Sequence, residues 1–455
     1  MTQWWMPYAL RPDGWARDVT LDVDAAGVIV GVATGTAPTG TRLNGAVVPA
    51  MPNLHSHAFQ RALAGRTGRS APGRDDSFWT WRQAMYAFLD RVDGEALEAI
   101  AAQTYVEMIK AGYGAVAEFH YVHHDPAGRP YADAGELAWR VVAAARTAGI
   151  ALTLLPVFYA HAGFGGSAAT AGQRRFVHTV YTFSHLVDRL RSGSAEHGYV
   201  LGVAPHSLRA VTPQELADVV AMASPGTPVH IHAAEQTREV DECFAWSGMR
   251  PVEWLLSKAQ PDARWCVVHA THMTERETAG LAASGAVAGL ALTTEADLGD
   301  GTFPGSAFLN AGGRFGVGSD SNTLISPFAE LRQFEWSQRL RARRRNVLAH
   351  AEDTTIGTAL WSRAAVGGAQ AVGRSCGAIT TGMRADLVVL NLDDPALAEQ
   401  RCEDLLDAAI FGPAILPVRD VLIAGAKVVT EGRHHNEAAV FARYRAALAR
   451  LGAMA

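Results

Sequence analysis

Eight short apolar runs, separated by segments long enough to form helices, occupy the middle of this 455-residue chain. The runs cover residues 46–57, 115–124, 150–160, 199–207, 228–235, 265–273, 286–294 and 314–322. Runs of this length and composition are typical of buried strands, and their alternation with helical segments indicates successive parallel βα units. Eight such units predict an α/β protein with a (β/α)8 TIM-like barrel.

Both ends of the chain have a different pattern from the middle. Residues 17–35 and 376–394 alternate apolar with polar side chains and contain turn-forming glycines, as antiparallel strands do. We therefore expect residues 1–48 and 375–455 to meet in one small β-sandwich, with residues 49–374 forming the barrel. The Ala- and Arg-rich segment 438–455 predicts a terminal helix.

Charge and cysteine content restrict the partners and the compartment. The formal net charge is −5, and the one basic run, residues 339–346, is expected to be the solvated face of a helix, so nucleic-acid binding is not indicated. The four cysteines are scattered without a CxxC spacing, which argues against disulfides and fits a reducing cytoplasm. No signal peptide is evident, and no apolar run reaches the roughly 20 residues of a membrane helix.

Polar side chains gather at the carboxyl ends of the apolar runs. They are His55, His57, the segment 118–124, His206, His232, Glu235, His269 and Asp320. In a (β/α)8 barrel the active site lies at this face. Histidines with a purely structural role would be scattered along the strands, so this distribution predicts one shared site.

His55 and His57 form the first half of a predicted metal site. Their i, i+2 spacing on a strand places both imidazoles on one face. A catalytic zinc ion needs three protein ligands and one open position, and His232 is the third candidate. Asp320 could bind the metal and also accept a proton from water. The alternatives are a surface loop that happens to hold two histidines, and an aspartate that caps a turn or helix.

Glu235 and His269 are the candidates for proton transfer. Glu235 follows His232 by three residues, and a carboxylate beside a metal site can carry protons from water to a leaving nitrogen. His269 ends the sixth run, where it could transfer a proton or stabilise an oxyanion. We interpret His230 and His272 as packed or structural histidines.

The chain contains four motifs whose order resembles that of one protein superfamily, and the resemblance covers essentially the whole chain. His55-Ser-His57, His232-Ala-Ala-Glu235, His269 and Ser319-Asp320 resemble the metal-dependent amidohydrolase superfamily, in its deaminase branch. The phrase GAITTGMRADLVVL is similar to that superfamily's return into the β-sandwich. Within the branch, further phrases resemble the formimidoylglutamate deiminase family: MPNLHSHAFQRALAG, SFWTWR, EFHYVHH, APHSLRAV and HAAEQ.

This resemblance implies an activity and a set of site residues. The activity is hydrolysis of N-formimidoyl-L-glutamate to N-formyl-L-glutamate and ammonia, in histidine degradation. The implied roles are one zinc ion per subunit on His55, His57, His232 and Asp320, proton transfer by Glu235 and His269 with help from Asp320, and substrate binding by Gln60, Arg82, Tyr121, His206 and Arg209. A homodimer is implied as well.

The predicted substrate-binding residues are compatible with a substrate that carries carboxylates. Arg binds a carboxylate through two parallel hydrogen bonds. Arg209 lies just past the fourth predicted strand and Arg82 in the long segment after the first, and the alternative is that either is an ordinary surface residue. Tyr121 and His206 could donate hydrogen bonds to a carboxylate. Gln60 could contact the substrate or belong to a helical turn.

Two other functions stay open at this stage. One is an aminohydrolase of the same superfamily that acts on a purine or adenosine derivative, such as guanine, S-adenosylhomocysteine or methylthioadenosine, which needs aromatic stacking more than two arginines. The other is a catalytically silent barrel, which predicts the loss of a metal ligand. Two-metal members of the superfamily use a carboxylated lysine at a strand end; the only lysines here are Lys110, Lys258 and Lys427, so we expect a single ion.

Overall fold

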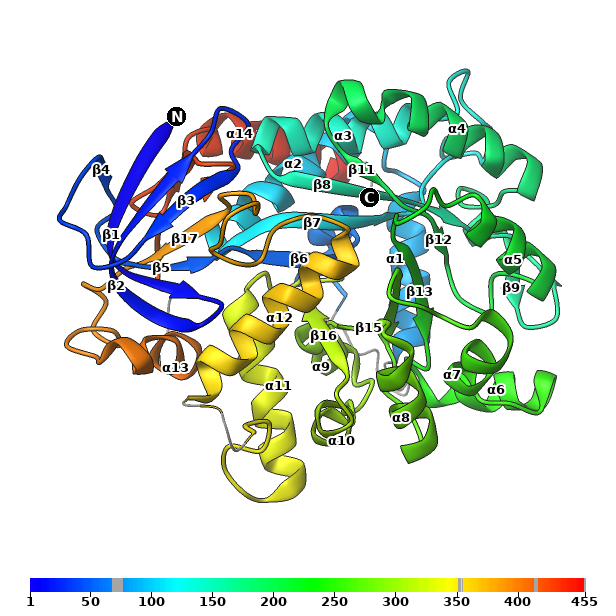
Figure 1. Ribbon diagram of the computed structural model, residues 1–455. Coiled ribbons are helices and arrows are strands. Elements are labelled where there is room, and N and C mark those ends of the chain that lie inside the picture. The colour runs from blue at the N-terminus through cyan, green and yellow to red at the C-terminus, as the bar shows by residue number, and fades with distance from the viewer. Residues whose placement is uncertain (68–76, 351–352, 354, 413–415, 454–455) are drawn as a thin grey trace.

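The computed structural model describes residues 1–67, 77–350, 353, 355–412 and 416–453 (Figure 1). Two parallel sheets form the middle of the chain. The first contains β6 (Met51–Ser56), β7 (Tyr113–His120), β8 (Ala151–Phe158), β11 (Val200–Leu201) and β12 (Ala204–Pro205). The second contains β13 (Val229–Ala233), β14 (Trp265–His269), β15 (Val287–Leu290) and β16 (Arg314–Val317). Because β11 and β12 both pair with β8, these strands occupy eight positions, one for each predicted run.

Isolated parallel bridges join the two sheets at both of their edges. The bridges are Ser56 with Asp320 at one seam, and Val203 with Val229 and Ser207 with His232 at the other. Backbone hydrogen bonds run through the first seam, because Asp320 donates to the carbonyl of His55 and receives a bond from the amide of His57. The strands therefore close on themselves, and the predicted TIM-like barrel is confirmed.

Helices surround the barrel strands (Figure 1). They are α2 (Gly94–Ala111), α3 (Glu136–Ala148), α4 (Val180–His197), α5 (Pro213–Ala221), α6 (Thr237–Ser247), α7 (Pro251–Trp254), α8 (Glu275–Ser284), α9 (Leu292–Leu298), α10 (Gly305–Asn310), α11 (Pro327–Ala342) and α12 (Ile356–Val372). Local sequence explains their ends: Thr212 caps α5 by accepting from the Glu215 amide, with Pro213 in the first turn. Helix α1 (Phe78–Leu89) and a small hairpin of β9 (His161–Gly163) and β10 (Ser167–Ala168) lie in the loops after β6 and β8.

Both ends of the chain build one antiparallel-rich sheet beside the barrel. Its strands are β1 (Thr2–Arg11), β2 (Gly14–Val23), β3 (Ile29–Ala33), β4 (Thr41–Arg42), β5 (Ala46–Pro49), β17 (Leu387–Leu390), β18 (Val418–Ile423), β19 (Ala426–Thr430) and β20 (Arg433–His434). The two ends meet where β5 pairs with β17. A separate apolar core containing Met6, Leu21 and Leu387 lies under this sheet. It corresponds to the predicted β-sandwich; the domain boundaries at residues 48 and 375 stay a prediction.

Three predicted runs have a different extent in the structure. The first run is divided, since residues 46–49 form β5 of the outer sheet and residues 51–56 form β6 of the barrel. The fourth run is divided into β11 and β12. The end of the seventh run is helical, because the Glu295 side chain accepts the amide of Ala291 and helps to start α9 there.

The remaining expectations concern the C-terminal helix, the basic run and the cysteines. Helix α14 (Glu437–Ala453) is confirmed and packs on α2, where Glu437 pairs with Lys110 at 2.6 Å. The basic run begins in the last turn of α11 and is mostly exposed. All four cysteines are free and buried.

In the described ranges, no helix is both long and apolar enough to cross a membrane. Helix α13 (Leu405–Phe411) packs on α11 and α12.

Candidate active site

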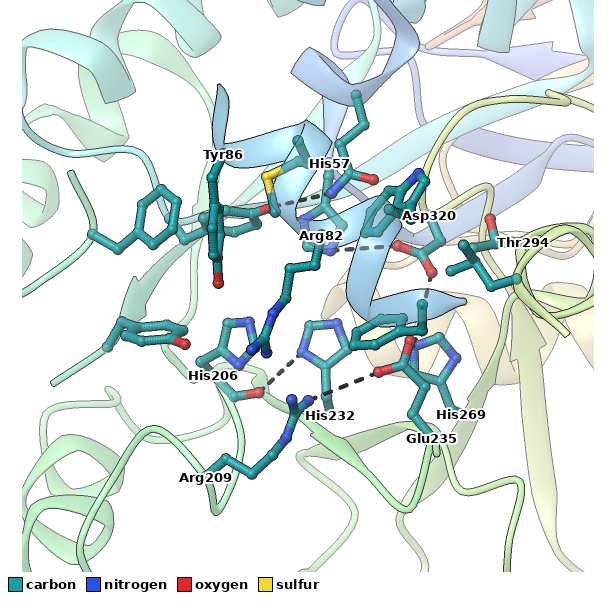
Figure 2. A pocket seen from close by; sticks show the side chains of 18 residues that line it. His57, Arg82, Tyr86, His206, Arg209, His232, Glu235, His269, Thr294 and Asp320 are labelled. Carbon is teal, nitrogen blue, oxygen red and sulfur yellow. Dashed lines mark hydrogen bonds and ion pairs between the residues drawn. The ribbon is translucent and has the colours of Figure 1, made fainter. Parts of the chain in front are cut away.

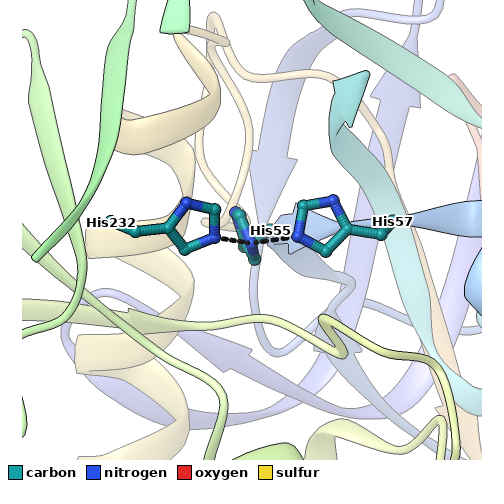
Figure 3. Close-up of side chains that lie close together, drawn as sticks. All are labelled: His55, His57 and His232. Carbon is teal, nitrogen blue, oxygen red and sulfur yellow. Dashed lines mark hydrogen bonds between the residues drawn. The ribbon is translucent and has the colours of Figure 1, made fainter. Parts of the chain in front are cut away.

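His55, His57 and His232 converge at the carboxyl end of the barrel, with His55 between the other two (Figure 3). The Nε2 atom of His55 lies 3.2 Å from Nε2 of His57 and 3.1 Å from Nε2 of His232. Asp320 Oδ1 lies 3.5 Å from Nε2 of His55 and 3.3 Å from Nε2 of His57. The structure thus brings together all four residues predicted as metal ligands, and all four are buried.

The Nδ1 atoms, which face away from the cluster, fix the tautomers of His57 and His232. Nδ1 of His57 lies 3.0 Å from the Phe119 carbonyl oxygen, and Nδ1 of His232 lies 3.0 Å from the His206 carbonyl oxygen. A carbonyl only accepts hydrogen bonds, so both Nδ1 atoms donate and both Nε2 atoms of the neutral rings present a lone pair.

His55 cannot satisfy both neighbours. Burial lowers the pKa of His55 to about 3, so its ring is neutral and Nε2 carries at most one hydrogen. At least one of the Nε2 lone pairs of His57 and His232 therefore faces His55 Nε2 across little more than 3 Å without receiving a hydrogen bond. A cation between the nitrogens would remove this repulsion, and neutral imidazoles with a carboxylate are typical zinc ligands. The donor set fits a metal ion.

The backbone around the site is under local strain. Several residues at or after strand ends adopt left-handed conformations, among them His269 with φ 68°, Asp320 with φ 42° and Asn322 with φ 57°. Such conformations cost on the order of 1–3 kcal/mol each and cluster at functional sites. The Asn322 side chain stabilises this turn by donating to the carbonyls of Asp320 at 2.9 Å and His57 at 3.0 Å.

A glycine lets the eighth strand pass the metal site closely. A Cβ atom on Gly318 would lie 2.9 Å from Cβ of His55 and 2.7 Å from its carbonyl oxygen. Any larger residue would push this backbone away from His55. Asp320 could then no longer reach the histidines.

Glu235, His269 and Asp320 form a second, acidic part of the site. His269 Nε2 lies 3.7 Å from Oε1 of Glu235 and 3.8 Å from Oδ2 of Asp320. Burial raises the pKa of the Glu235 carboxyl to about 7, although His269 and Arg209 oppose this. Burial alone would lower the pKa of His269, but the nearby carboxylates raise it to about 10. A carboxyl group that exchanges its proton near neutral pH beside a metal site is suited to proton transfer.

A pocket opens over these groups, and Figure 2 shows two arginines pointing into it from different sides. All five residues predicted to bind substrate line it: Gln60, Arg82, Tyr121, His206 and Arg209. Arg82 comes from α1 of the same chain, so the site needs no neighbouring subunit to receive it. Arg209 is only 6% exposed, and its Nη2 lies 3.9 Å from Oε2 of Glu235.

The pocket leaves a hydrogen-bond donor and an acceptor of these residues available to a ligand. Among the described residues, Nε of Arg209 and Oε1 of Gln60 are buried without a hydrogen-bond partner. Nε2 of Gln60, in the helical turn Ala58–Leu63 directly after β6, donates to the Tyr121 hydroxyl at 3.0 Å. The His206 ring lies against that of His232, with centroids 4.9 Å apart. An anionic ligand end would meet the arginines here, while its other end faces the metal site.

Several pocket residues were not predicted from the sequence. Aromatic side chains form one wall: Phe78, Trp81, Tyr86, Tyr159 and Phe176. The phrase SFWTWR contains two of them, and it could have indicated this wall. Glu295, whose Oε1 lies 3.2 Å from Nδ1 of His269, was missed because the seventh run was interpreted as strand up to residue 294.

The lysines and the two remaining histidines agree with the sequence analysis. Lys110 lies in the last turn of α2, Lys258 in a helical turn and Lys427 in β19, so none ends a barrel strand. His230 is fully buried and contacts the Ala371 carbonyl at 2.8 Å, and His272 contacts the Asp300 carbonyl at 2.7 Å.

Comparison with known proteins places the chain in a family. Residues 46–428 match the amidohydrolase family, and residues 7–42 match the N-terminal domain of formimidoylglutamate deiminase HutF. A formimidoylglutamate deiminase from Pseudomonas aeruginosa is 53% identical over 94% of this chain and 95% of its own length. This chain belongs to the formimidoylglutamate deiminase family of amidohydrolases. It is therefore a hydrolase that acts on a C–N bond other than a peptide bond.

Two further proteins, one solved structure and one more distant relative, are also similar to this chain. A crystal structure of an amidohydrolase from Brucella melitensis superposes with a TM-score of 0.94 at 48% identity, covering 99% of this chain and 100% of that one. A 5-methylthioadenosine/S-adenosylhomocysteine deaminase from Natronomonas pharaonis is 26% identical over 91% of this chain and 89% of its own length. The sequence identity of this chain to the Pseudomonas aeruginosa deiminase is thus about twice its identity to the Natronomonas pharaonis deaminase.

Proposed function

We propose that this enzyme hydrolyses N-formimidoyl-L-glutamate to N-formyl-L-glutamate and ammonia, as a step of histidine degradation in the cytoplasm. The observation that carries this proposal is the convergence of Arg82 and Arg209 in a pocket whose floor is a buried histidine and carboxylate cluster. The substrate has complementary ends, because its two carboxylates suit the guanidinium groups and its amidine carbon suits the metal end.

The proposed cofactor is one zinc ion, held by His55, His57, His232 and Asp320. Three imidazoles and one carboxylate match the ligands that zinc prefers, and the Nε2 lone pair that receives no hydrogen bond from His55 supports a cation there. When bound, such an ion lowers the pKa of water from ~15.7 towards ~7 and so makes a nucleophile available near neutral pH.

In this proposal the side chains of the chain itself move the protons. Glu235 takes a proton from the attacking water and passes it to the terminal nitrogen of the formimidoyl group, while Asp320 and His269 orient the water. A bond forms between the water oxygen and the formimidoyl carbon to give a tetrahedral adduct. Glu235 then carries the remaining hydroxyl proton to the same nitrogen, the bond from the carbon to that nitrogen breaks as the carbonyl forms, and ammonia leaves. The pKa of Glu235, raised by burial to about 7, supports both halves of this transfer near neutral pH.

Substrate binding is assigned to the other residues of the pocket. Arg82 and Arg209 bind the carboxylates of the glutamate moiety, and Gln60, Tyr121 and His206 hydrogen-bond to it. Holding the glutamate end fixes the reacting carbon beside the nucleophile, so that binding energy lowers the barrier.

Ammonia release by the purified, zinc-loaded protein tests the proposal. N-formimidoyl-L-glutamate is compared with guanine, adenosine and S-adenosylhomocysteine, and chelator-treated protein is the control. We expect metal-dependent release from the first substrate alone. Release only from a purine compound would retain the metal site and Glu235 but contradict the substrate assignment, and it would favour the purine-type aminohydrolase.

We also propose a homodimer, which rests on the resemblance to the family. Light scattering coupled to size-exclusion chromatography would give twice the chain mass. A monomer with full activity would contradict the dimer and leave the catalytic proposal intact, because Arg82 and the other site residues come from one chain.

A further inference from the structure

His269 differs from the predicted metal ligands in the partner of its Nδ1 atom. Nδ1 of His57 and Nδ1 of His232 each contact a backbone carbonyl, whereas Nδ1 of His269 lies 3.2 Å from the carboxylate oxygen Oε1 of Glu295. Both His269 and Glu295 are buried, with 1% and 2% of their surface exposed. The neighbour that orients the His269 ring is therefore a side chain, and it can be exchanged by mutation.

Glu295 is itself held in place from two directions. It lies in the first turn of α9, and its Oε1 also accepts the backbone amide of Ala291 at 3.1 Å. Its own amide donates to the Ala291 carbonyl at 2.8 Å. The N-terminus of a helix favours a negative charge, so this carboxylate sits where the helix stabilises it. Glu295 is thus a fixed acceptor for the imidazole.

The opposite edge of the His269 ring faces the reacting groups. Nε2 lies 3.7 Å from Glu235 and 3.8 Å from Asp320, which is too far for either carboxylate to fix the ring by a direct hydrogen bond. The contact with Glu295, at 3.2 Å, is the shortest of the three. It determines that Nδ1 carries a hydrogen and that Nε2 points into the pocket.

We propose that Glu295 is a positioning residue for the reaction, which acts by accepting the Nδ1 hydrogen of His269 and so fixing the orientation of its ring. This inference depends on the proposed function in one respect, because His269 must take part in turnover. A purely structural role of Glu295, as the acceptor that starts α9, is the competing interpretation. The two differ because a structural role would affect folding but not the state of the His269 ring.

Three variants of the zinc-loaded enzyme separate these interpretations. Glu295→Ala removes the acceptor, and Glu295→Gln keeps an amide oxygen that can still accept from Nδ1. Glu330→Gln is the matched control, because Glu330 on α11 is also a fully buried glutamate that binds α9, but it accepts from the backbone amide of Thr293 at 3.1 Å. If Glu295→Ala does not fold, Glu295→Met keeps the side-chain length without an acceptor.

Steady-state kinetics give the first readout. We expect Glu295→Ala to lower kcat about 10- to 100-fold, as for other partners that orient a site histidine, with KM and bound metal nearly unchanged. Glu295→Gln should recover most of the loss, and Glu330→Gln should keep the wild-type kcat. Wild-type kcat in Glu295→Ala, or no recovery in Glu295→Gln at unchanged melting temperature, would overturn the proposal.

Nitrogen NMR of protein labelled at histidine gives a second readout that needs no substrate. The His269 signals are assigned by their loss in His269→Asn. We expect a protonated Nδ1 in the wild type and in Glu295→Gln, and a changed Nδ1 signal in Glu295→Ala. Unchanged His269 signals in Glu295→Ala would overturn the positioning role. Because this spectrum does not depend on turnover, failure of the substrate assignment would leave it interpretable.

Discussion

The described residues include two clusters of closely packed histidines, and they differ in what their nitrogen atoms face. The metal-site cluster holds His55, His57 and His232, with ring centroids 4.7 and 4.8 Å from His55. The second cluster, His120, His123, His124 and His178, lies beyond the end of β7 and is packed as closely, with centroids 4.7 to 5.4 Å apart. Close packing of imidazoles alone does not distinguish the two.

The direction of the nitrogens and the neighbouring charges do distinguish them. In the second cluster, Nε2 of His123 and Nε2 of His124 each contact a different backbone carbonyl at 2.9 Å. The buried guanidinium of Arg175 lies beside this cluster and donates to the His124 carbonyl. The metal-site cluster is instead bordered by carboxylates. Histidines become a cation site when their free nitrogens converge near negative charge. They act as packing groups where their nitrogens face separate partners, as Nε2 of His123 and Nε2 of His124 do; Nε2 of His120 and Nε2 of His178 are buried without a hydrogen-bond partner.

The largest expected effect tests this comparison directly. His232→Asn should remove one converging nitrogen, so that bound metal falls from one ion per chain to nearly none and activity is lost. His123→Asn changes a histidine of the second cluster and should keep full metal content. Metal analysis of both purified variants gives the answer. Equal metal loss in both would show that the two clusters are not distinct in the way described.

The next effect concerns the carboxylates beside the metal site. Glu235→Gln should lower kcat by about 10²- to 10⁴-fold, because it removes a general acid–base group without removing a ligand. Bound metal should stay at the wild-type level. Stopped assays of ammonia release with parallel metal analysis measure both quantities, and near-normal turnover would refute the proton-transfer role.

A smaller effect is expected from the arginines. Arg209→Met should raise KM about 10- to 100-fold, since a hydrogen bond to a charged group is worth about 1.5–3 kcal/mol. Arg238→Met is a suitable control, because the guanidinium carbons of Arg209 and Arg238 both lie over the Trp79 ring, 6.0 Å and 4.4 Å from its centroid. Unlike Arg209, Arg238 is largely exposed and paired with Glu242. An unchanged KM in Arg209→Met would remove this residue from carboxylate binding.

The smallest effect is on the pH dependence of stability and involves the second cluster. Burial, with a contribution from Arg175, lowers the pKa of His120 to about 3, whereas an unfolded histidine has its usual value of 6.5. As the pH falls below 6.5 the unfolded chain takes up this proton first, so stability present above pH 6.5 is lost between pH 6.5 and 3. One such histidine accounts for up to about 1.4 kcal/mol per pH unit.

Denaturant unfolding at pH 7.5, 6.5 and 5.5 checks this expectation. His120→Gln should lose less stability on acidification than the wild type. His185→Gln, at an exposed position on α4, should behave as the wild type. If the wild type and His120→Gln lose stability equally, His120 does not contribute to the pH dependence.

The sequence was sufficient to predict the barrel and most of the site, because both depend on local patterns. The spacing of His55 and His57 and the positions of Glu235, His269 and Asp320 at strand ends follow from apolar runs whose carboxyl ends meet at one face. The segment 118–124 shows the limit of this reasoning. It also ends a strand and is rich in histidine, yet most of its histidines belong to packing, because Arg175 and the carbonyls that meet them come from remote segments.

Glu295 shows a second limit. Its role depends on where a strand stops and a helix starts, and the apolar run 286–294 does not reveal that boundary. The divided first run has the same cause, because residues 46–49 and 51–56 are equally apolar but pair with different sheets. Strand identity can be inferred from composition, whereas pairing partners depend on contacts between distant parts of the chain.

The barrel is closed only by isolated bridges at its two seams, and the predicted metal ligands lie beside both of them. His55 lies in β6 of the first sheet and His57 directly follows that strand, while His232 lies in β13 of the second sheet and Asp320 lies in the loop after β16. An ion bound by all four side chains would therefore be a non-covalent cross-link between the two halves of the barrel. Since it would close long stretches of chain, its binding free energy would add to the free energy of folding. The cofactor would then complete the architecture as well as the chemistry.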